Sequence, residues 1–237
     1  MSRPFRFKQF TVKQAINAQK VGTDSMLLGA WVTGNFNRIL DIGTGTGILA
    51  LMMAQKNPTA DITAIEPDLA SLNEAKDNFN TSAFSNRMLA IHSPLQTFGS
   101  MEKFDLIISN PPYFENAYLS DDLERNRARH TDQLPVYELY ECAAELLADN
   151  GEFYVVVPYD EERNHLSRAG HENLYVKKLL RTLRPDGKYK RSLICFSFEE
   201  NDTISPATLL VKSADNKYSK AYIELTKDFY AKDLSAE

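Results

Sequence analysis

The stretch Arg38-Ile-Leu-Asp41-Ile-Gly43-Thr44-Gly45-Thr-Gly47-Ile-Leu decides the fold of this 237-residue chain. An apolar, β-rich run comes first, three alternate glycines follow, and an apolar helical run begins directly after them, which predicts a strand, a tight turn and a helix. Glycine permits a sharp turn and lets a ligand approach the backbone, because it carries no Cβ. The stretch therefore predicts a ligand-binding turn at the end of a strand.

From Arg38 onward, β-rich runs alternate with helical runs, a rhythm typical of a mostly parallel sheet with helices on both faces. The helix at 136–148 has Gly151 just beyond its end, and strands 175–183 and 192–198 flank the turn-like Arg184-Pro-Asp-Gly187 as an antiparallel hairpin. We expect one α/β domain over residues 38–237, preceded by a cover or substrate-contact segment at 1–37. The remaining strands are predicted at 38–42, 61–65, 88–91, 104–109, 152–157 and, as a further short strand, 208–212, and the remaining helices at 46–56, 68–80 and 220–230.

An acidic residue, Glu66, ends the strand after the glycine turn, the layout that holds a nucleoside ribose. The turn reads Asp-x-Gly-x-Gly-x-Gly rather than the dinucleotide pattern G-x-G-x-x-G, and it resembles the first motif of class I methyltransferases. That resemblance implies a Rossmann-like, mostly parallel seven-stranded sheet with an antiparallel edge hairpin, and S-adenosylmethionine as cofactor. It also implies that Asp41 organises the loop, that Gly43, Thr44, Gly45 and Gly47 border the methionine part, and that Glu66 binds the ribose hydroxyls. The alternative is that Glu66 caps a helix and the glycines only turn the chain.

One feature of many such enzymes is missing. They place an Asp after the third strand to bind the adenine amino group, whereas this chain has His92-Ser93-Pro94-Leu95 there. Pro94 has no side-chain acceptor and no backbone N–H. We therefore expect Ser93 or the nearby backbone to substitute.

The run Asp105-Leu-Ile-Ile-Ser-Asn110-Pro111-Pro112-Tyr113 ends the fourth strand at the sheet edge where open α/β folds bind ligands. An amino nitrogen on adenine or on a glutamine amide is a poor nucleophile, because its lone pair is delocalised. Hydrogen bonds accepted from both of its N–H groups, by the Asn110 side-chain oxygen and the Pro111 carbonyl, would localise that pair. The prolines restrict the backbone and Tyr113 can stack on the planar target. The simpler alternative is a tight turn.

Further stretches extend the pattern beyond the two motifs: Phe7–Phe10, 20–24 with 27–31, 192–198, and 217–222 with 229–230. With these stretches, the glycine turn and 105–113, the chain resembles the bacterial tRNA1(Val) adenine-37 N6-methyltransferase family over almost its whole length. The resemblance implies methylation at N6 of the adenosine beside the tRNA anticodon, with Lys20, Gly22, Thr23 and Asp24 near the cofactor mouth. A loop between helices is the alternative for those four residues.

The formal net charge is −5, which disfavours a protein that grips nucleic acid over its whole surface. Local basic clusters remain, and a solvated charged face is the alternative for each of them. The aromatic residues among the first ten predict either a cover over the sheet or a surface that meets RNA. We expect RNA contacts from Arg6, Lys8 and Lys20 and from Arg125, Arg127 and Arg129; a late cluster holds Lys177, Lys178, Arg181, Arg184, Lys188, Lys190 and Arg191.

The sequence also argues against a membrane protein, a secreted protein and a metalloprotein. No apolar run approaches the roughly 20 residues of a membrane span, no signal-like segment opens the chain, and Cys142 and Cys195 lack metal-ligand spacing, so we expect a cytoplasmic protein without metal or disulfide. No obligate protein partner is evident. Three rival functions stay open: a glutamine N5-methyltransferase acting on a translation factor, methylation of another RNA amino group, and an RNA-binding module without catalysis.

Overall fold

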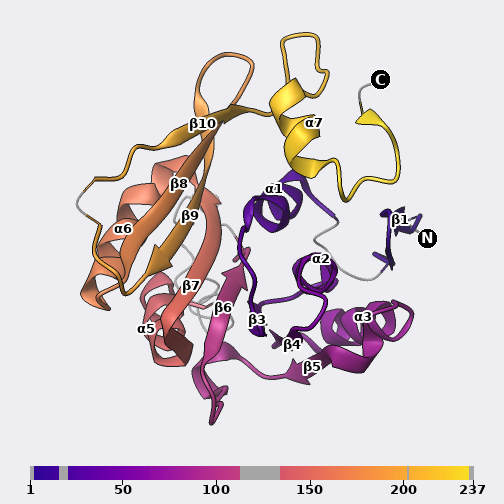
Figure 1. Cartoon of the computed structure of the whole chain (residues 1–237), viewed down its shortest axis with the longest axis vertical. Coiled ribbons are helices and arrows are strands. Elements are labelled where there is room, and N and C mark those ends of the chain that lie inside the picture. The colour runs from indigo at the N-terminus through magenta and orange to yellow at the C-terminus, as the bar shows by residue number, and fades with distance from the viewer. Residues whose placement is uncertain (1–2, 16–20, 113–133, 202, 235–237) are drawn as a thin grey trace, which may run out of the picture.

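The fold is an eight-stranded sheet covered by helices on both faces (Figure 1). The computed structural model describes residues 3–15, 21–112, 134–201 and 203–234. Strand β9 runs antiparallel to both of its neighbours, β7 and β8, and every other strand pair in the sheet is parallel. The strand order is β10-β8-β9-β7-β6-β3-β4-β5, and the strands are β3 (Arg38–Ile42), β4 (Asp61–Glu66), β5 (Met88–His92), β6 (Phe104–Ser109), β7 (Leu147–Pro158), β8 (Tyr175–Leu183), β9 (Tyr189–Ser197) and β10 (Ala207–Leu210).

Two helical layers sandwich the sheet (Figure 1). One face carries α1 (Thr23–Trp31), α2 (Ile48–Lys56), α3 (Leu69–Asn80) and α7 (Lys220–Thr226), and the other carries α5 (Val136–Leu146) and α6 (Glu162–His171). Within the described ranges, single turns of 3-10 helix lie at Ser85–Arg87, Leu95–Thr97 and Tyr159–Glu161. A small antiparallel pair, β1 (Phe5–Arg6) with β2 (Thr11–Val12), precedes α1.

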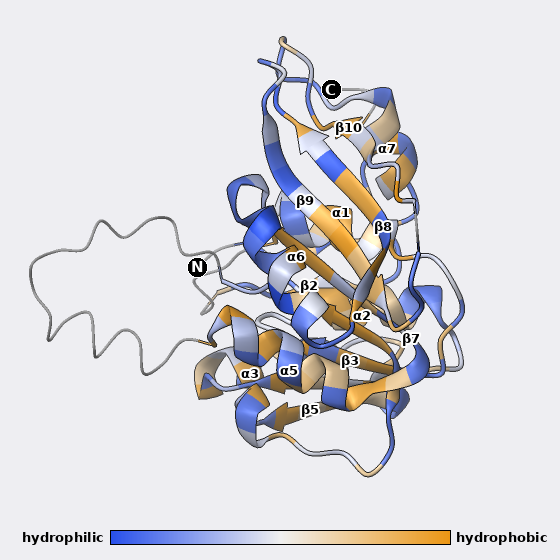
Figure 2. Cartoon of the chain, turned by 90° about the vertical axis from the view of Figure 1, so that its left-hand side faces the viewer, coloured by the Kyte–Doolittle hydropathy of each residue, from blue (hydrophilic) through white to orange (hydrophobic). Residues whose placement is uncertain are grey.

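The strand sequences divide the core in two. Along β7, Tyr154 and Val156 belong to the core cluster that includes α1, α2 and α3, whereas Phe153 and Val155 belong to the cluster that includes α5. This alternation follows from the two-residue period of a strand, and burial on both faces explains why the central strands are almost continuously apolar. Apolar residues accordingly concentrate along the strands in Figure 2.

The strand count was underestimated. The short strand expected at 208–212 is β10, which joins the sheet as an eighth member and pairs parallel with β8 from Ala207↔Leu180 to Leu210↔Leu183. The β8–β9 hairpin is therefore not at the sheet edge, because β10 covers the outer side of β8. An edge strand with unpaired backbone groups is unfavourable, and four residues of β10 are enough to satisfy part of that edge.

The end of α5 also differs from the prediction. The helix ends at Leu146, and β7 begins at the next residue without a loop. Gly151, expected just after the helix, lies inside β7, where the pairing with β6 shifts register between Phe104 and Leu106. A bulged strand start is not visible in a hydrophobic period.

The N-terminal aromatic residues are part of the packing. Phe7 and Phe10 are buried and their rings stack at 4.4 Å, while Phe7 forms a β-bridge with Tyr230 near the other end of the chain. Arg6 and Lys8 alternate with these rings and are exposed. None of the helices in the described ranges has the length and apolar character needed to cross a bilayer.

Candidate active site

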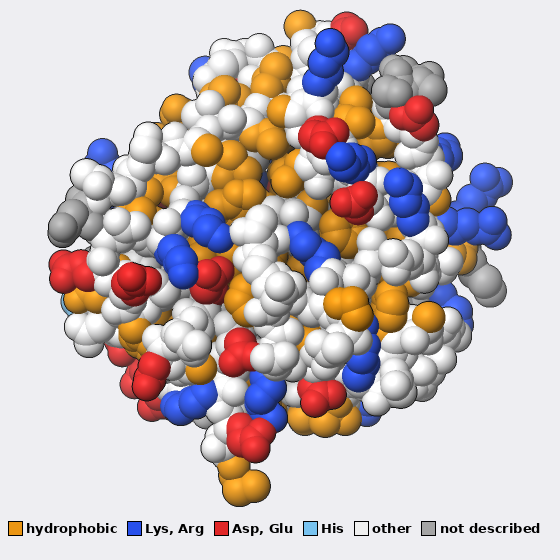
Figure 3. Space-filling model, viewed as in Figure 1, with side chains coloured by type: hydrophobic (Ala, Val, Ile, Leu, Met, Phe, Trp, Pro, Cys, Tyr) orange, Lys and Arg blue, Asp and Glu red, His pale blue; other side chains and the backbone are white. Residues whose placement is uncertain are grey.

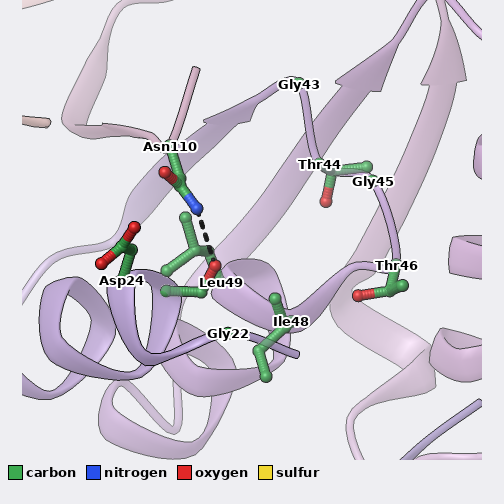
Figure 4. Close-up of a pocket in the computed structure, with 10 residues that line it drawn as sticks. Gly22, Asp24, Gly43, Thr44, Gly45, Thr46, Ile48, Leu49 and Asn110 are labelled. Atoms are coloured by element: carbon green, nitrogen blue, oxygen red, sulfur yellow. Dashed lines mark hydrogen bonds between the residues drawn. The ribbon is translucent and has the colours of Figure 1, made fainter. Parts of the chain in front are cut away.

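Two cavities meet at the glycine turn, on the edge where β3, β4 and β6 end. The larger has a volume of about 750 Å³ and the smaller about 170 Å³. Gly43, Gly45 and Asn110 line both of them, so the cavities share a wall. Figure 4 shows these three residues among those that line the smaller cavity. The larger cavity is also lined by Glu66, Pro67, Asp68, Ser93, Pro94, Leu95, Gln96, Pro111 and Pro112, and the smaller by Gly22, Asp24, Ser25, Thr44 and Thr46.

Asp41 ties the turn to the helix behind it. Its Oδ2 accepts hydrogen bonds from the Thr44 hydroxyl at 2.6 Å and from the Ala50 N–H, in the first turn of α2, at 3.1 Å. Burial raises the pKa of Asp41 to about 7, although these two hydrogen bonds oppose the rise. Its Oδ1 is buried and has no hydrogen-bond partner among the described residues. The side chain lines neither cavity, so it acts on the site through the loop.

Glu66 lies at the end of β4 with its carboxylate against the glycine turn. One oxygen accepts from the Gly45 N–H at 2.9 Å and the other from the Asp68 N–H at 3.0 Å. These bonds hold a negatively charged acceptor at the wall of the larger cavity. Asp68 caps α3 by accepting from the Ser71 N–H, so the helix-capping role considered for Glu66 belongs to Asp68.

The glycines of the turn have different surroundings. Gly43 and Gly47 have φ angles of +68° and +82°, in the left-handed region that disfavours other residues. A Cβ at Gly43 would stand in open space, whereas a Cβ at Gly47 would overlap the Phe79 ring. Gly47 is not among the residues lining either cavity, and its lack of a side chain lets the turn before α2 pack against Phe79 of α3.

Asn110 follows β6 and stands between the two cavities. Its side-chain nitrogen donates to the Ser25 hydroxyl of α1 at 2.9 Å, drawn as the dashed line in Figure 4. This bond sets which end of the amide faces α1 and which end carries the acceptor oxygen. Ser109, one residue earlier, donates to the Ile42 carbonyl at 3.0 Å and joins the ends of β6 and β3.

Asp24 reaches the smaller cavity from the first turn of α1. Its carboxylate pairs with Arg191 of β9 at 2.9 Å, and each side chain is only 20% exposed. The pair joins α1 to the antiparallel strand across the sheet edge. Thr23, its predicted companion, does not appear in the lining of either cavity.

The far end of the larger cavity lies beside Ser93 and Pro94. The Ser93 hydroxyl donates to the Pro94 carbonyl at 2.9 Å, and the Ser93 N–H donates to the Glu66 carbonyl at 3.3 Å. Gln96 lines the same region and donates to Glu138 of α5 at 2.7 Å. The described residues contain no group of three or more His, Cys, Asp or Glu that could hold a metal ion.

Several predicted residues lie outside the described ranges. Tyr113, Lys20 and the three arginines Arg125, Arg127 and Arg129 are among them.

The chain is similar to known methyltransferases along nearly its whole length. It is 41% identical over 233 residues to a Flavobacterium psychrophilum protein named tRNA1(Val) (adenine(37)-N6)-methyltransferase, covering 96% of this chain and 99% of that one. It is 42% identical over 234 residues to a Bacteroides thetaiotaomicron protein of the same name, covering 97% and 98%. The chain belongs to the tRNA1(Val) (adenine(37)-N6)-methyltransferase family. The resemblance predicted from the sequence is thereby confirmed.

Broader comparisons place this family among the methyltransferases. The family model described as "Methyltransferase small domain" matches residues 16–173. The solved structure of Atu636 from Agrobacterium tumefaciens, a predicted O-methyltransferase, is 18% identical with a TM-score of 0.67 and covers 87% of this chain and 96% of its own. The predicted Rossmann-like methyltransferase fold is confirmed.

The sequence prediction of the site in this tRNA1(Val) (adenine(37)-N6)-methyltransferase family member missed two residues, Ser25 and Arg191. Ser25 directly follows a predicted site residue, so its neighbourhood was a usable signal. No local sequence signal linked Arg191 with the site, because 167 positions separate it from Asp24.

Proposed function

We propose that this protein transfers a methyl group from S-adenosylmethionine to N6 of adenosine 37, beside the anticodon of tRNA1(Val). The assignment of the substrate rests on the near-full-length similarity to relatives that bear this name. The two cavities at the glycine turn support the proposal, because they lie where the cofactor and the target base would have to meet. A tRNA substrate implies that the protein acts in the cytoplasm.

The residues around the two cavities fit the cofactor. The glycine turn offers room against its backbone, since a Cβ at Gly43 would enter open space, and the Glu66 carboxylate at the wall of the larger cavity suits ribose hydroxyls. Gly43, Gly45 and Asp24 would hold the methionine part, and Ser93 with Leu95 would border the adenine. When bound, S-adenosylmethionine supplies an electrophilic methyl group.

The chemistry required of the protein is to make a delocalised amino group nucleophilic. Asn110 and Pro111 line the larger cavity directly after β6, and both offer carbonyl oxygens that can accept from the two N–H groups of adenine N6. Because Ser25 holds the amide nitrogen of Asn110, the amide is preorganised before the target arrives. Pro111 and Pro112 restrict the backbone that presents the second carbonyl. Tyr113 is proposed to stack on the base.

The test is incubation of the purified protein with labelled S-adenosylmethionine and total tRNA that lacks this modification, followed by nucleoside analysis and mapping. N6-methyladenosine beside the valine anticodon is the expected product. Label in a glutamine of a translation factor, with none in RNA, would overturn the substrate while keeping the chemistry of Asn110.

A further inference from the structure

The turn between β8 and β9 is a compact, solvent-exposed projection. The Arg184 N–H donates to the Lys188 carbonyl at 2.8 Å, and the Gly187 N–H donates to the Arg184 carbonyl at 3.0 Å. Every residue from Arg184 to Lys190 is exposed. The hairpin therefore presents its side chains on a hydrogen-bonded backbone, and it forms no part of the two cavities.

The hairpin rises from the same sheet edge as the active site (Figure 1). Strand β9 begins where β7 ends, with Arg191 opposite Pro158, and β7 is the neighbour of β6, whose last residue precedes Asn110. At the base of the hairpin, Arg191 pairs with Asp24 of the smaller cavity. The hairpin and Asn110 thus lie on one edge of the sheet, with β9 two strands away from β6.

The basic residues of the hairpin differ from the other members of the late basic cluster. Lys177 and Lys178 pair with Glu152, Arg181 pairs with Glu162, and Arg191 pairs with Asp24. Within the described ranges, no carboxylate lies at ion-pair distance from the side chains that remain, Arg184, Lys188 and Lys190.

The single acidic residue of the turn has a local role. One Asp186 oxygen accepts from the Lys188 N–H at 3.0 Å and so helps to close the turn. Three cations against this one carboxylate leave the hairpin locally positive on a chain of net charge −5. On the face seen in Figure 3, by contrast, basic and acidic side chains are interspersed.

An ordered aromatic pair lies beside these cations. The rings of Tyr159 and Tyr189 are 4.7 Å apart, and the Arg181 guanidinium lies 5.6 and 5.7 Å from their centroids. Glu162 holds that guanidinium with two hydrogen bonds, of 2.8 and 2.6 Å. Tyr189 nevertheless keeps 36% of its surface exposed. Ordered aromatic rings next to exposed cations are what single-stranded nucleic acids bind, since bases stack on the rings while phosphates meet the charges.

We propose that the β8–β9 hairpin is an RNA-contact surface, on which Arg184, Lys188 and Lys190 neutralise phosphates and Tyr189 stacks on an unpaired base. The proposal rests on the proposed function, because it requires an RNA substrate. It adds a surface distinct from the predicted contacts at Arg6, Lys8, Lys20, Arg125, Arg127 and Arg129.

The first test removes the three charges together, as Arg184→Gln, Lys188→Gln and Lys190→Gln. Binding of unmodified tRNA to the full chain is measured over a range of KCl concentrations. The slope of log affinity against log salt should fall by about 2 to 3, because each phosphate contact contributes about 0.7 to 0.9. Affinity at low salt should fall at least tenfold, while the affinity for S-adenosylmethionine and the rate at saturating tRNA stay unchanged.

A matched control removes three exposed cations from other parts of the fold, Lys76→Gln, Lys103→Gln and Arg168→Gln. It should leave the slope near that of the wild type. A second pair of variants isolates stacking: Tyr189→Leu should weaken tRNA binding about tenfold, whereas Tyr189→Phe keeps the ring and should bind like the wild type.

The outcomes separate this inference from the proposed function. If the wild type methylates tRNA but the hairpin variant has the same salt slope as the control variant, the hairpin proposal is wrong and the function stands. If the wild type neither binds nor methylates tRNA, the function itself fails. Unchanged tRNA binding together with lost binding to polyglutamate would assign the surface to an acidic protein and overturn the RNA proposal.

Discussion

Asn110 is the residue to which we assign the activation of the amino group, and its amide nitrogen donates a hydrogen bond to Ser25. Asn110→Ala should lower the rate of methyl transfer by about 10²–10³, because a positioned acceptor is lost. Ser25→Ala keeps that acceptor and loses only its orientation, so a smaller decrease of about tenfold is expected. Single-turnover methylation of tRNA measures both rates.

The affinity for S-adenosylmethionine, measured by calorimetry, is the control for both variants. It should remain near the wild-type value, because neither side chain is assigned to hold the cofactor. A loss of affinity as large as the loss of rate would show that Asn110 binds the cofactor rather than the target amino group.

Gly47 shows how one residue sets the packing between two elements. Gly47→Ala should lower the free energy of unfolding by about 2–4 kcal/mol, since the new methyl group meets Phe79 and the left-handed backbone disfavours any L-residue. Gly43→Ala is the matched control. It carries the backbone penalty, about 1–2 kcal/mol, without a steric overlap. Urea titration of the cofactor-free protein distinguishes the two variants, and equal losses would refute the packing role of Gly47.

The contact between α5 and α6 should make stability depend on pH. Burial lowers the pKa of His165 to about 4, and its Nδ1 lies 3.0 Å from the Tyr140 hydroxyl. As the pH falls from 6.5 towards 4, the unfolded chain takes up a proton at His165 that the folded chain does not. The free energy of unfolding therefore decreases by about 1.4 kcal/mol per pH unit from this group, and the contribution is fully present above pH 6.5.

The measurement for this prediction is a series of urea titrations between pH 4.5 and 7.5. His165→Gln places a side chain that does not titrate at position 165 and leaves every other titratable group in place, so the difference in the free energy of unfolding between wild type and variant should shrink as the pH falls. A difference that stays constant with pH would show that His165 does not titrate as inferred.

On the scale of the whole molecule, cofactor binding couples several elements, because the cavity walls come from α1, β3, β4 and β6. A ligand that binds only the folded chain raises the free energy of unfolding, by about 2.7 kcal/mol at a concentration of 100 Kd. S-adenosylhomocysteine should therefore raise the unfolding temperature. Asn110→Ala should keep this shift. Glu66→Gln should lose much of it, since one acceptor oxygen that faces the Gly45 or Asp68 N–H is replaced by a donor.

Differential scanning calorimetry with and without S-adenosylhomocysteine measures these shifts. An unchanged shift in Glu66→Gln would contradict the assignment of Glu66 to the cofactor site.

Local sequence patterns determined the type of fold and the position of the site on it. The strand, turn and helix at residues 38–49 and the strand that ends at Asn110 were readable because each feature depends on neighbours within a few residues. The alternation of strands and helices in turn specified a parallel sheet, and with it the edge at which the glycine turn meets Asn110.

Only the tertiary structure decided which distant residues meet there. Ser25 and Asn110 are separated by 85 positions, and Asp24 and Arg191 by 167. Gly47 resembles the other glycines of the turn in sequence, yet it faces Phe79 of α3. The late basic cluster likewise divides into paired residues and an exposed hairpin only once β7, β8 and β9 are placed side by side. Such contacts follow from strand order and from the packing of helices on the sheet, and a local pattern of residue types encodes neither.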